Sequence, residues 1–289
     1  MVENNAVRVA PKDRLVGRDA KVEKWKNASE ELVKYPAGMV TDSAGNILYE
    51  YKKGARLLIL GQEVMDDCQT PWAEATVDQA FEALGNKKDV SVLERGFGMG
   101  IIATRTIQHL DLTGGSYACI ELNKAVADYA KGKWFDKQTK ISKTRATSPL
   151  GGRDKGSSVL TTFEMIEGDA VKETAKLASE GRKFDIIFSD TFPLTEEEKS
   201  VNDLLDIETV VKCLNPDGVF AFFGYYAGYQ GELNQQQRSL VERNFDRVTR
   251  TIVKGINPPP DYKYFNPQSG PVRELPVIIC TKPRIPVEA

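Results

Sequence analysis

Short apolar runs alternate with amphipathic segments along most of the chain after residue 88. Runs such as DVSVLE (89–94), SYACIEL (116–122) and KFDIIFSD (183–190) have the length and content of buried strands. Between them, segments such as IIATRTIQHL (101–110) place apolar residues at helical spacing. Strands that alternate with helices in this way predict an α/β fold, with a parallel sheet covered by helices on both faces.

The last two predicted strands follow a different pattern. FDRVTRTIVKG (245–255) and ELPVIICTK (274–282) are separated by a proline-rich loop instead of a helix. Without a crossover helix the two strands are expected to run antiparallel. The sequence therefore predicts a Rossmann-like, seven-stranded, mostly parallel sheet with an antiparallel last strand.

The first part of the chain is polar, and we interpret residues 1–56 as an N-terminal extension before a main domain at 57–289. We expect a helix around Ala28–Tyr35 and a hairpin over Gly38–Tyr51, because turn-forming residues stand between two short apolar runs. The segment 136–161 is polar and has no periodicity, which predicts a surface insertion in the main domain.

Composition excludes several classes of function. The 289 residues include 39 Lys and Arg against 41 Asp and Glu, for a net charge of −2, so there is no basic excess for nucleic acid. No apolar run reaches the roughly 18 residues that a membrane span needs. The four cysteines form no CxxC pair. We expect a cytoplasmic protein with reduced cysteines that acts on a small molecule and does not bind membranes. Whether it forms a homodimer is left open.

The chain has a single histidine, His109, which lies in a segment of helical pattern. A His-rich metal site is therefore excluded, and a catalytic triad would need this one residue. Proton transfer must come mainly from carboxylates, tyrosines or lysines, or the reaction must need little base catalysis.

A glycine-rich turn, Glu94-Arg-Gly96-Phe-Gly98-Met-Gly100, follows the first strand of the main domain. Glycines allow a sharp turn and a close ligand approach, and the next helix offers free N–H groups. The dinucleotide fingerprint G-x-G-x-x-G would need glycine where Ile101 stands. The pattern E-x-G-x-G-x-G instead resembles that of class I methyltransferases that depend on S-adenosylmethionine (SAM).

That resemblance implies where SAM would bind, without a metal. The glycines would pass beneath its methionine and ribose parts, and Glu94 would orient the amino-acid end. Glu121, at the end of the second strand, can accept both ribose hydroxyls, and the segment at Asp169 can meet the adenine amino group. The implied cofactor residues are Glu94, Gly96, Phe97, Gly98, Gly100, Glu121, Leu122, Gly168, Asp169, Ala170 and Asp190.

Three longer motifs point to a narrower group. VMDDCQTPW (64–72), FSDTFPLTEE (188–197) and PPPDYKYFNPQ (258–268), with the glycine turn, resemble the guanidinoacetate N-methyltransferase family and the related fungal and plant-type arginine N-methyltransferases. The likeness extends from about residue 57 to 282. It implies SAM-dependent methyl transfer to a guanidino nitrogen of a small molecule such as arginine or a guanidino acid.

By the same resemblance, Asp66 and Asp190 clamp the guanidino group as the catalytic pair. The chemistry fits, because the N–H groups of a planar guanidinium can donate two parallel hydrogen bonds to one carboxylate. The other implied substrate residues are Thr191, Tyr225, Tyr226 and Tyr264.

The chain departs from the family motifs at Cys68, Gln69 and Ser189, where those families have tryptophan, an acid and tyrosine. Three alternatives stay open. They are a protein arginine methyltransferase, a small-molecule amine N- or O-methyltransferase of natural-product metabolism, and a SAM-binding regulator without catalysis.

Overall fold

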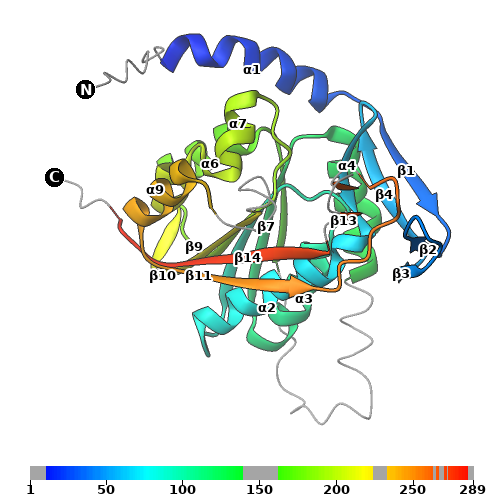
Figure 1. Cartoon of the computed structure of the whole chain (residues 1–289). Helices are drawn as coiled ribbons and strands as arrows, with labels where there is room; N and C mark the ends of the chain where they lie inside the picture. The colour runs from blue at the N-terminus through cyan, green and yellow to red at the C-terminus, as the bar shows by residue number, and fades with distance from the viewer. Residues whose placement is uncertain are drawn as a thin grey trace, which may run out of the picture.

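A seven-stranded sheet forms the centre of the computed structural model, which describes residues 11–138, 162–223, 233–262, 265–266, 270–271 and 273–285. Its strand order is β11-β14-β10-β9-β6-β7-β8 (Figure 1). The strands are β6 (Val90–Arg95), β7 (Gly115–Glu121), β8 (Thr162–Glu167), β9 (Phe184–Ser189), β10 (Leu214–Phe223), β11 (Phe245–Lys254) and β14 (Glu274–Pro283).

The pairing confirms the predicted sheet. β6 lies parallel between β7 and β9, β8 continues the parallel part beyond β7, and β10 continues it beyond β9. β14 is antiparallel to both β10 and β11, as the proline-rich connection predicts. The carboxyl ends of β6, β7, β8 and β9 therefore meet at one edge, where open α/β sheets bind their ligands.

Helices cover both faces of the sheet, with α2 and α3 on one side and α6, α7 and α9 on the other (Figure 1). The strands are apolar on both faces, so alternate residues enter two separate cores; Val92 belongs to one and Leu93 to the other. The helices are α2 (Thr70–Leu84), α3 (Ile101–Thr113), α4 (Lys124–Tyr129), α6 (Ala170–Ser179), α7 (Glu196–Val201), α8 (Ile207–Lys212) and α9 (Gln235–Asn244), with short turns η1 (Asp67–Gln69), η2 (Ala130–Trp134) and η3 (Asn202–Leu204).

The N-terminal region contains one helix, α1 (Pro11–Lys26), and two small sheets. β1 (Glu30–Tyr35), β4 (Gly54–Ile59) and β5 (Gln62–Asp66) form one, and β2 (Gly38–Thr41) and β3 (Ile47–Tyr51) form the predicted hairpin. A further two-stranded sheet joins β12 (Phe265–Asn266) to β13 (Gly270–Pro271).

The helix predicted around Ala28–Tyr35 is wrong, because β1 occupies residues 30–35 and the helix lies before it. β1 pairs antiparallel with β4 from Glu30 opposite Ile59 to Tyr35 opposite Gly54. This tertiary pairing outweighs the local helical preference of the segment. The three-stranded sheet also crosses the expected boundary at residue 57, since β4 spans it.

Some predicted features lie outside the described residues. These are most of the predicted insertion, at 139–161, together with Tyr225, Tyr226 and Tyr264. Within the described part of the chain, no helix is both long enough and apolar enough to cross a membrane.

Candidate functional site

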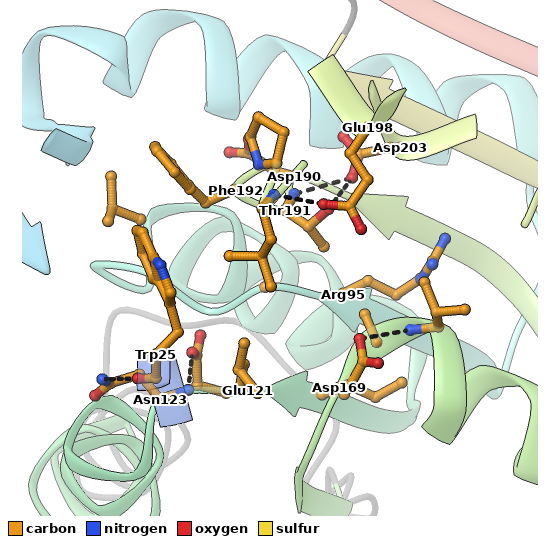
Figure 2. A pocket seen from close by; sticks show the side chains of 18 of the residues that line it. Trp25, Arg95, Glu121, Asn123, Asp169, Asp190, Thr191, Phe192, Glu198 and Asp203 are labelled. Carbon is orange, nitrogen blue, oxygen red and sulfur yellow. Dashed lines mark hydrogen bonds between the residues drawn. The ribbon is translucent and has the colours of Figure 1, made fainter. Parts of the chain in front are cut away.

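A pocket lies at the carboxyl edge of the sheet, where β6, β7 and β9 end (Figure 2). Eight of the residues predicted to bind cofactor or substrate line it: Gly96, Gly98, Glu121, Leu122, Asp169, Ala170, Asp190 and Thr191. These residues come from four separate stretches of sequence, each at or just after a strand end. The structure thus brings together most of the predicted cofactor set.

The three glycines of the turn adopt positive φ angles of +92° at Gly96, +52° at Gly98 and +73° at Gly100. These angles confirm the sharp turn predicted from the sequence, and the packing of the chain gives a second reason for glycine. A Cβ at Gly96 would lie 2.4 Å from the carbonyl oxygen of Asp190, and one at Gly98 would lie 3.0 Å from Met65 Sδ. The glycines therefore let the turn pack against the chain's own β9 and β5 ends, in a conformation that L side chains rarely adopt.

Glu121 closes the glycine turn from the end of β7. Its Oε2 accepts hydrogen bonds from the backbone N–H of Phe97 at 2.9 Å and of Gly98 at 3.4 Å, and its Oε1 accepts one from Asn123 N at 2.7 Å. Burial raises the pKa of Glu121, and these backbone donors oppose the rise. The carboxylate predicted to meet the ribose therefore also orders the turn that lies beside it.

Glu94 lies near the end of β6 and is absent from the described pocket lining. It is 1% exposed, Tyr117 Oη donates a hydrogen bond to its Oε2, and its Oε1 has no hydrogen-bond partner among the described residues. Burial raises the pKa of Glu94 well above its ordinary value, and the nearby carboxylates of Asp190 and Glu121 add to the rise. Burial therefore favours the neutral, protonated form of Glu94 in this structure.

Asp169, predicted to meet adenine, is held by a residue that sequence analysis did not find. Arg18 of α1 binds both Asp169 oxygens, through Nη1 and, at 2.8 Å, through Nη2. Its Nε contacts Glu198 Oε1 at 2.5 Å. Arg18 is 7% exposed, so the three residues form a buried ionic cluster at the pocket wall.

Helix α1 therefore forms one wall of the pocket, and it runs along the α7 side of the molecule to β1 (Figure 1). Trp25 stacks on Phe192 with ring centroids 4.6 Å apart, and both line the pocket. Asn123 Nδ2 donates to Trp25 O at 3.0 Å (Figure 2), and Lys21 Nζ donates to Leu194 O at 2.9 Å. No local pattern in the sequence indicates these contacts, because their partners lie about a hundred or more positions away.

The pocket lining is acidic. Among the described residues it contains two cations, Arg18 and Arg95, and six carboxylates: Glu121, Asp169, Asp190, Glu198, Asp203 and Asp206. Both arginines are already paired, since Arg95 Nη2 contacts the two oxygens of Asp206 at 2.7 and 2.9 Å. The excess of negative charge favours a positively charged ligand.

Asp66 lies apart from this arrangement. It ends β5, is 0% exposed and is absent from the described pocket lining, although its neighbours Val64 and Met65 are present. Its Oδ1 accepts from Tyr35 Oη at 2.6 Å and from Cys68 N at 2.8 Å, and its Oδ2 lies 3.5 Å from Arg56 Nε. Asp66 is thus held inside the protein by hydrogen bonds from Tyr35 and Cys68, with Arg56 as its ion-pair partner.

The remaining predicted residues have supporting positions. Phe97 is fully buried, and its ring would meet a Cβ at Gly100, so it packs beneath the turn. Gly168 precedes α6, and its backbone N–H donates to Glu121 O at 2.9 Å. His109 of α3 contacts Asp78 of α2 at 2.6 Å and is absent from the described pocket lining.

Comparison with known proteins gives one family match. Residues 42–150, less than half of the chain, match the guanidinoacetate N-methyltransferase family. No curated protein sequence matches the chain. The matched stretch includes β5, the glycine turn and Glu121, and it supports a methyltransferase.

Solved structures extend the likeness over most of the chain. A spermidine synthase in complex with the transition state analogue AdoDATO superposes with a TM-score of 0.51 at 12% identity, over 86% of this chain and 72% of that one. The spermidine synthase from Thermotoga maritima gives 0.51 at 13% identity, over 87% and 81%. The fold is Rossmann-like. Human methyltransferase-like protein 13 in complex with SAH gives 0.46 at 16%, over 77% and 84%.

Proposed function

We propose that the protein is a SAM-dependent N-methyltransferase that methylates the guanidino nitrogen of a small molecule of the arginine or guanidino-acid type. The observation that supports this most is the acidic pocket at the carboxyl edge, where Gly96, Glu121, Asp169 and Asp190 converge. The family match at residues 42–150 supports the methyl-transfer chemistry.

The pocket residues fit SAM. The cofactor supplies a methyl group on a positively charged sulfonium, and the acidic lining favours such a cation. Glu121 would hold the ribose, the α6 start at Ala170 would face the adenine, and Glu94, with its unbonded Oε1, would lie below the amino-acid end. Asp169 stays committed to Arg18, so its part would be to hold the pocket wall.

Asp190 would then orient the acceptor. Methyl transfer forms an N–C bond while the S–C bond breaks, and the nitrogen must lose a proton during the reaction. A carboxylate beside the nitrogen stabilises the positive charge that develops there and can take up the proton. No metal ligand is needed for this step.

A second candidate function is a small-molecule amine N-methyltransferase, and one contact in the structure favours it. Arg56, which is 7% exposed, lies within 3.5 Å of Asp66, Glu63 and Asp261, and so the Asp66 carboxylate is already matched by a guanidinium. If Asp66 stays with Arg56, Asp190 is the one member of the predicted pair that would face the acceptor. One carboxylate suits an ammonium better than a guanidinium. The two superposed spermidine synthases are named for a polyamine product.

Binding and turnover separate these functions. We expect titration calorimetry of the full chain to show binding of SAM and of its product SAH. Methyl-labelled SAM should then label guanidinoacetate or arginine, and not primary amines or intact proteins. Labelling of amines alone would favour the second candidate, and labelling of protein arginines would identify a protein methyltransferase.

A matched pair of variants tests the role of Asp190. Asp190→Asn should lower turnover at least tenfold on the best acceptor. Asp185→Asn should leave turnover unchanged, because Asp185 is a buried aspartate at the opposite end of the same strand, β9, bound to Lys87 and Ser91. Equal activity of the two variants would contradict the proposed role.

A further inference from the structure

Asp203, in the short turn η3, makes hydrogen bonds on both sides of Asp190. The side chain is 4% exposed and lines the pocket. Its Oδ1 accepts a hydrogen bond from Ser189 Oγ at 3.0 Å. The same oxygen accepts from Thr191 N at 3.0 Å and from Thr191 Oγ1 at 2.5 Å (Figure 2). One oxygen thus binds the residue before Asp190 and the residue after it.

These bonds act where the sheet no longer holds the chain. β9 ends at Ser189, so the ladder of the parallel sheet does not fix the next two residues. Asp190 N still donates to Arg95 O at 3.0 Å, and Gly96 approaches Asp190 O so closely that a Cβ would lie 2.4 Å away. Asp203 adds a further constraint on the segment, from both sides of Asp190.

The surroundings keep the Asp203 side chain in place. Arg95 attracts its negative charge electrostatically and is itself anchored to Asp206, three residues further along the chain. Burial raises the pKa of Asp203, and the bonds from Ser189 and Thr191 oppose that rise, so the donors favour the charged form. A charged acceptor makes stronger hydrogen bonds than a neutral one.

We propose that Asp203 is a positioning residue, which holds Asp190 in the orientation that the acceptor nitrogen requires. This inference rests on the proposed function, since it assigns Asp203 to the same reaction. The inference also assigns a role to Ser189, which stands where the related families have tyrosine. The Ser189 hydroxyl donates a hydrogen bond to Asp203. Small displacements of a catalytic group are costly, because rate depends steeply on its alignment with the reacting atoms.

Four variants test the proposal by steady-state kinetics with the best acceptor. Asp203→Ala should lower kcat by about 10- to 100-fold and change the KM for the acceptor by less than about threefold. Asp203→Asn should recover most of the loss, because its amide oxygen can still accept the same bonds. Ser189→Ala and Thr191→Val should each lower kcat about threefold, and neither should have a further effect once Asp203 is alanine.

The matched control is Asp185→Ala. Asp185 lies on β9, is about as buried as Asp203, and accepts hydrogen bonds from Ser91 and Asn215. It should lower the melting temperature as much as Asp203→Ala does and leave kcat unchanged. If Asp203→Ala fails to fold, the Ser189→Ala and Thr191→Val variants decide. Full kcat in both variants would overturn the proposal, and so would effects that add to that of Asp203→Ala where that variant folds.

A crystal structure of the Asp203→Ala variant, or of the Ser189→Ala and Thr191→Val double variant if Asp203→Ala does not fold, separates this inference from the proposed function. We expect the Asp190 main chain to shift from its contact with Arg95 O, whether or not a methyl acceptor has been found. An unchanged Asp190 would refute the positioning role. Absence of SAM binding by the unaltered protein would refute the proposed function and leave the structural result to be judged by itself.

Discussion

Gly96 is the residue on which the closeness of the turn to β9 depends most. Replacement by alanine would place a Cβ 2.4 Å from Asp190 O at a φ of +92°. We expect Gly96→Ala to lower the free energy of unfolding by more than about 1 kcal/mol, measured by urea denaturation, and to weaken SAM binding at least tenfold.

Gly132 provides the control, because it lies in the π-helical segment η2 without a positive φ, and a Cβ there would meet none of the described atoms considered within 4 Å. Gly132→Ala should be neutral or stabilise the protein by up to about 1 kcal/mol. A loss of stability equal to that of Gly96→Ala would show that the close approach to Asp190 is not the cause.

Glu94 should make stability depend on pH. Because burial raises its folded pKa above the ordinary value of 4.5, the folded state holds a proton that the unfolded state has lost. Its contribution is fully present below about pH 4.5 and is lost as the pH rises towards the folded pKa. Glu94→Gln should therefore raise the melting temperature at pH 8 and leave it unchanged at pH 4.

The exposed Glu196 serves as a control of opposite sign. Its hydrogen bond with Lys199 lowers the pKa of Glu196, so its small contribution is present at neutral pH and is lost as the pH falls. Glu196→Gln should not stabilise the protein at pH 8. Stabilisation by both substitutions would indicate a general charge effect instead of burial at Glu94.

At the scale of elements, α1 is tied to the main domain by the Arg18 cluster. Removing Arg18 leaves Asp169 and Glu198 as uncompensated buried charges, which typically costs about 3–5 kcal/mol. Arg18→Met should therefore lower the free energy of unfolding by about 3 kcal/mol or more in urea denaturation, with weaker SAM binding. Lys172→Met, which removes an exposed ion pair with Asp19, should change it by less than about 1 kcal/mol.

The inner strands of the main domain could be predicted from sequence because β6, β7 and β9 are short apolar runs that are mostly buried. β9 is buried along its whole length and appears in the sequence as KFDIIFS. β1 has no such run, since EELVKY is mostly exposed and becomes a strand only by pairing with β4. Its conformation depends on residues about 20 positions away, and no local pattern reports them.

The residues of the candidate site also fall into two groups, those that the sequence predicts and those that it does not. Gly96, Glu121, Asp169 and Asp190 could be predicted because parallel strands bring their carboxyl ends to one edge. Arg18, Trp25 and Asp203 could not, because they reach the pocket through tertiary contacts. The pairing of Asp66 with Arg56 was equally invisible, since it depends on the register of β4 and β5.

For the whole molecule, the acidic pocket predicts that SAM binding releases protons. A sulfonium near Glu121 would lower the raised pKa of that carboxyl, so the affinity should increase with pH above the ordinary value of 4.5. Calorimetry in buffers of different ionisation enthalpy measures the number of protons released. Glu121→Gln should bind more weakly and lose most of this pH dependence, and an unchanged dependence would assign the protons to another group.

The position of α1 has a practical consequence for fragments of this chain. A polypeptide limited to the family match, residues 42–150, would keep the glycine turn and Glu121 and would lack Arg18, Asp169 and Asp190. More than half of the residues that line the pocket would be missing, and only β6 and β7 of the seven-stranded sheet would remain. The ends of the family match are therefore unsuitable as the ends of an expressed fragment, because helix α1 and the second half of the chain line the same pocket.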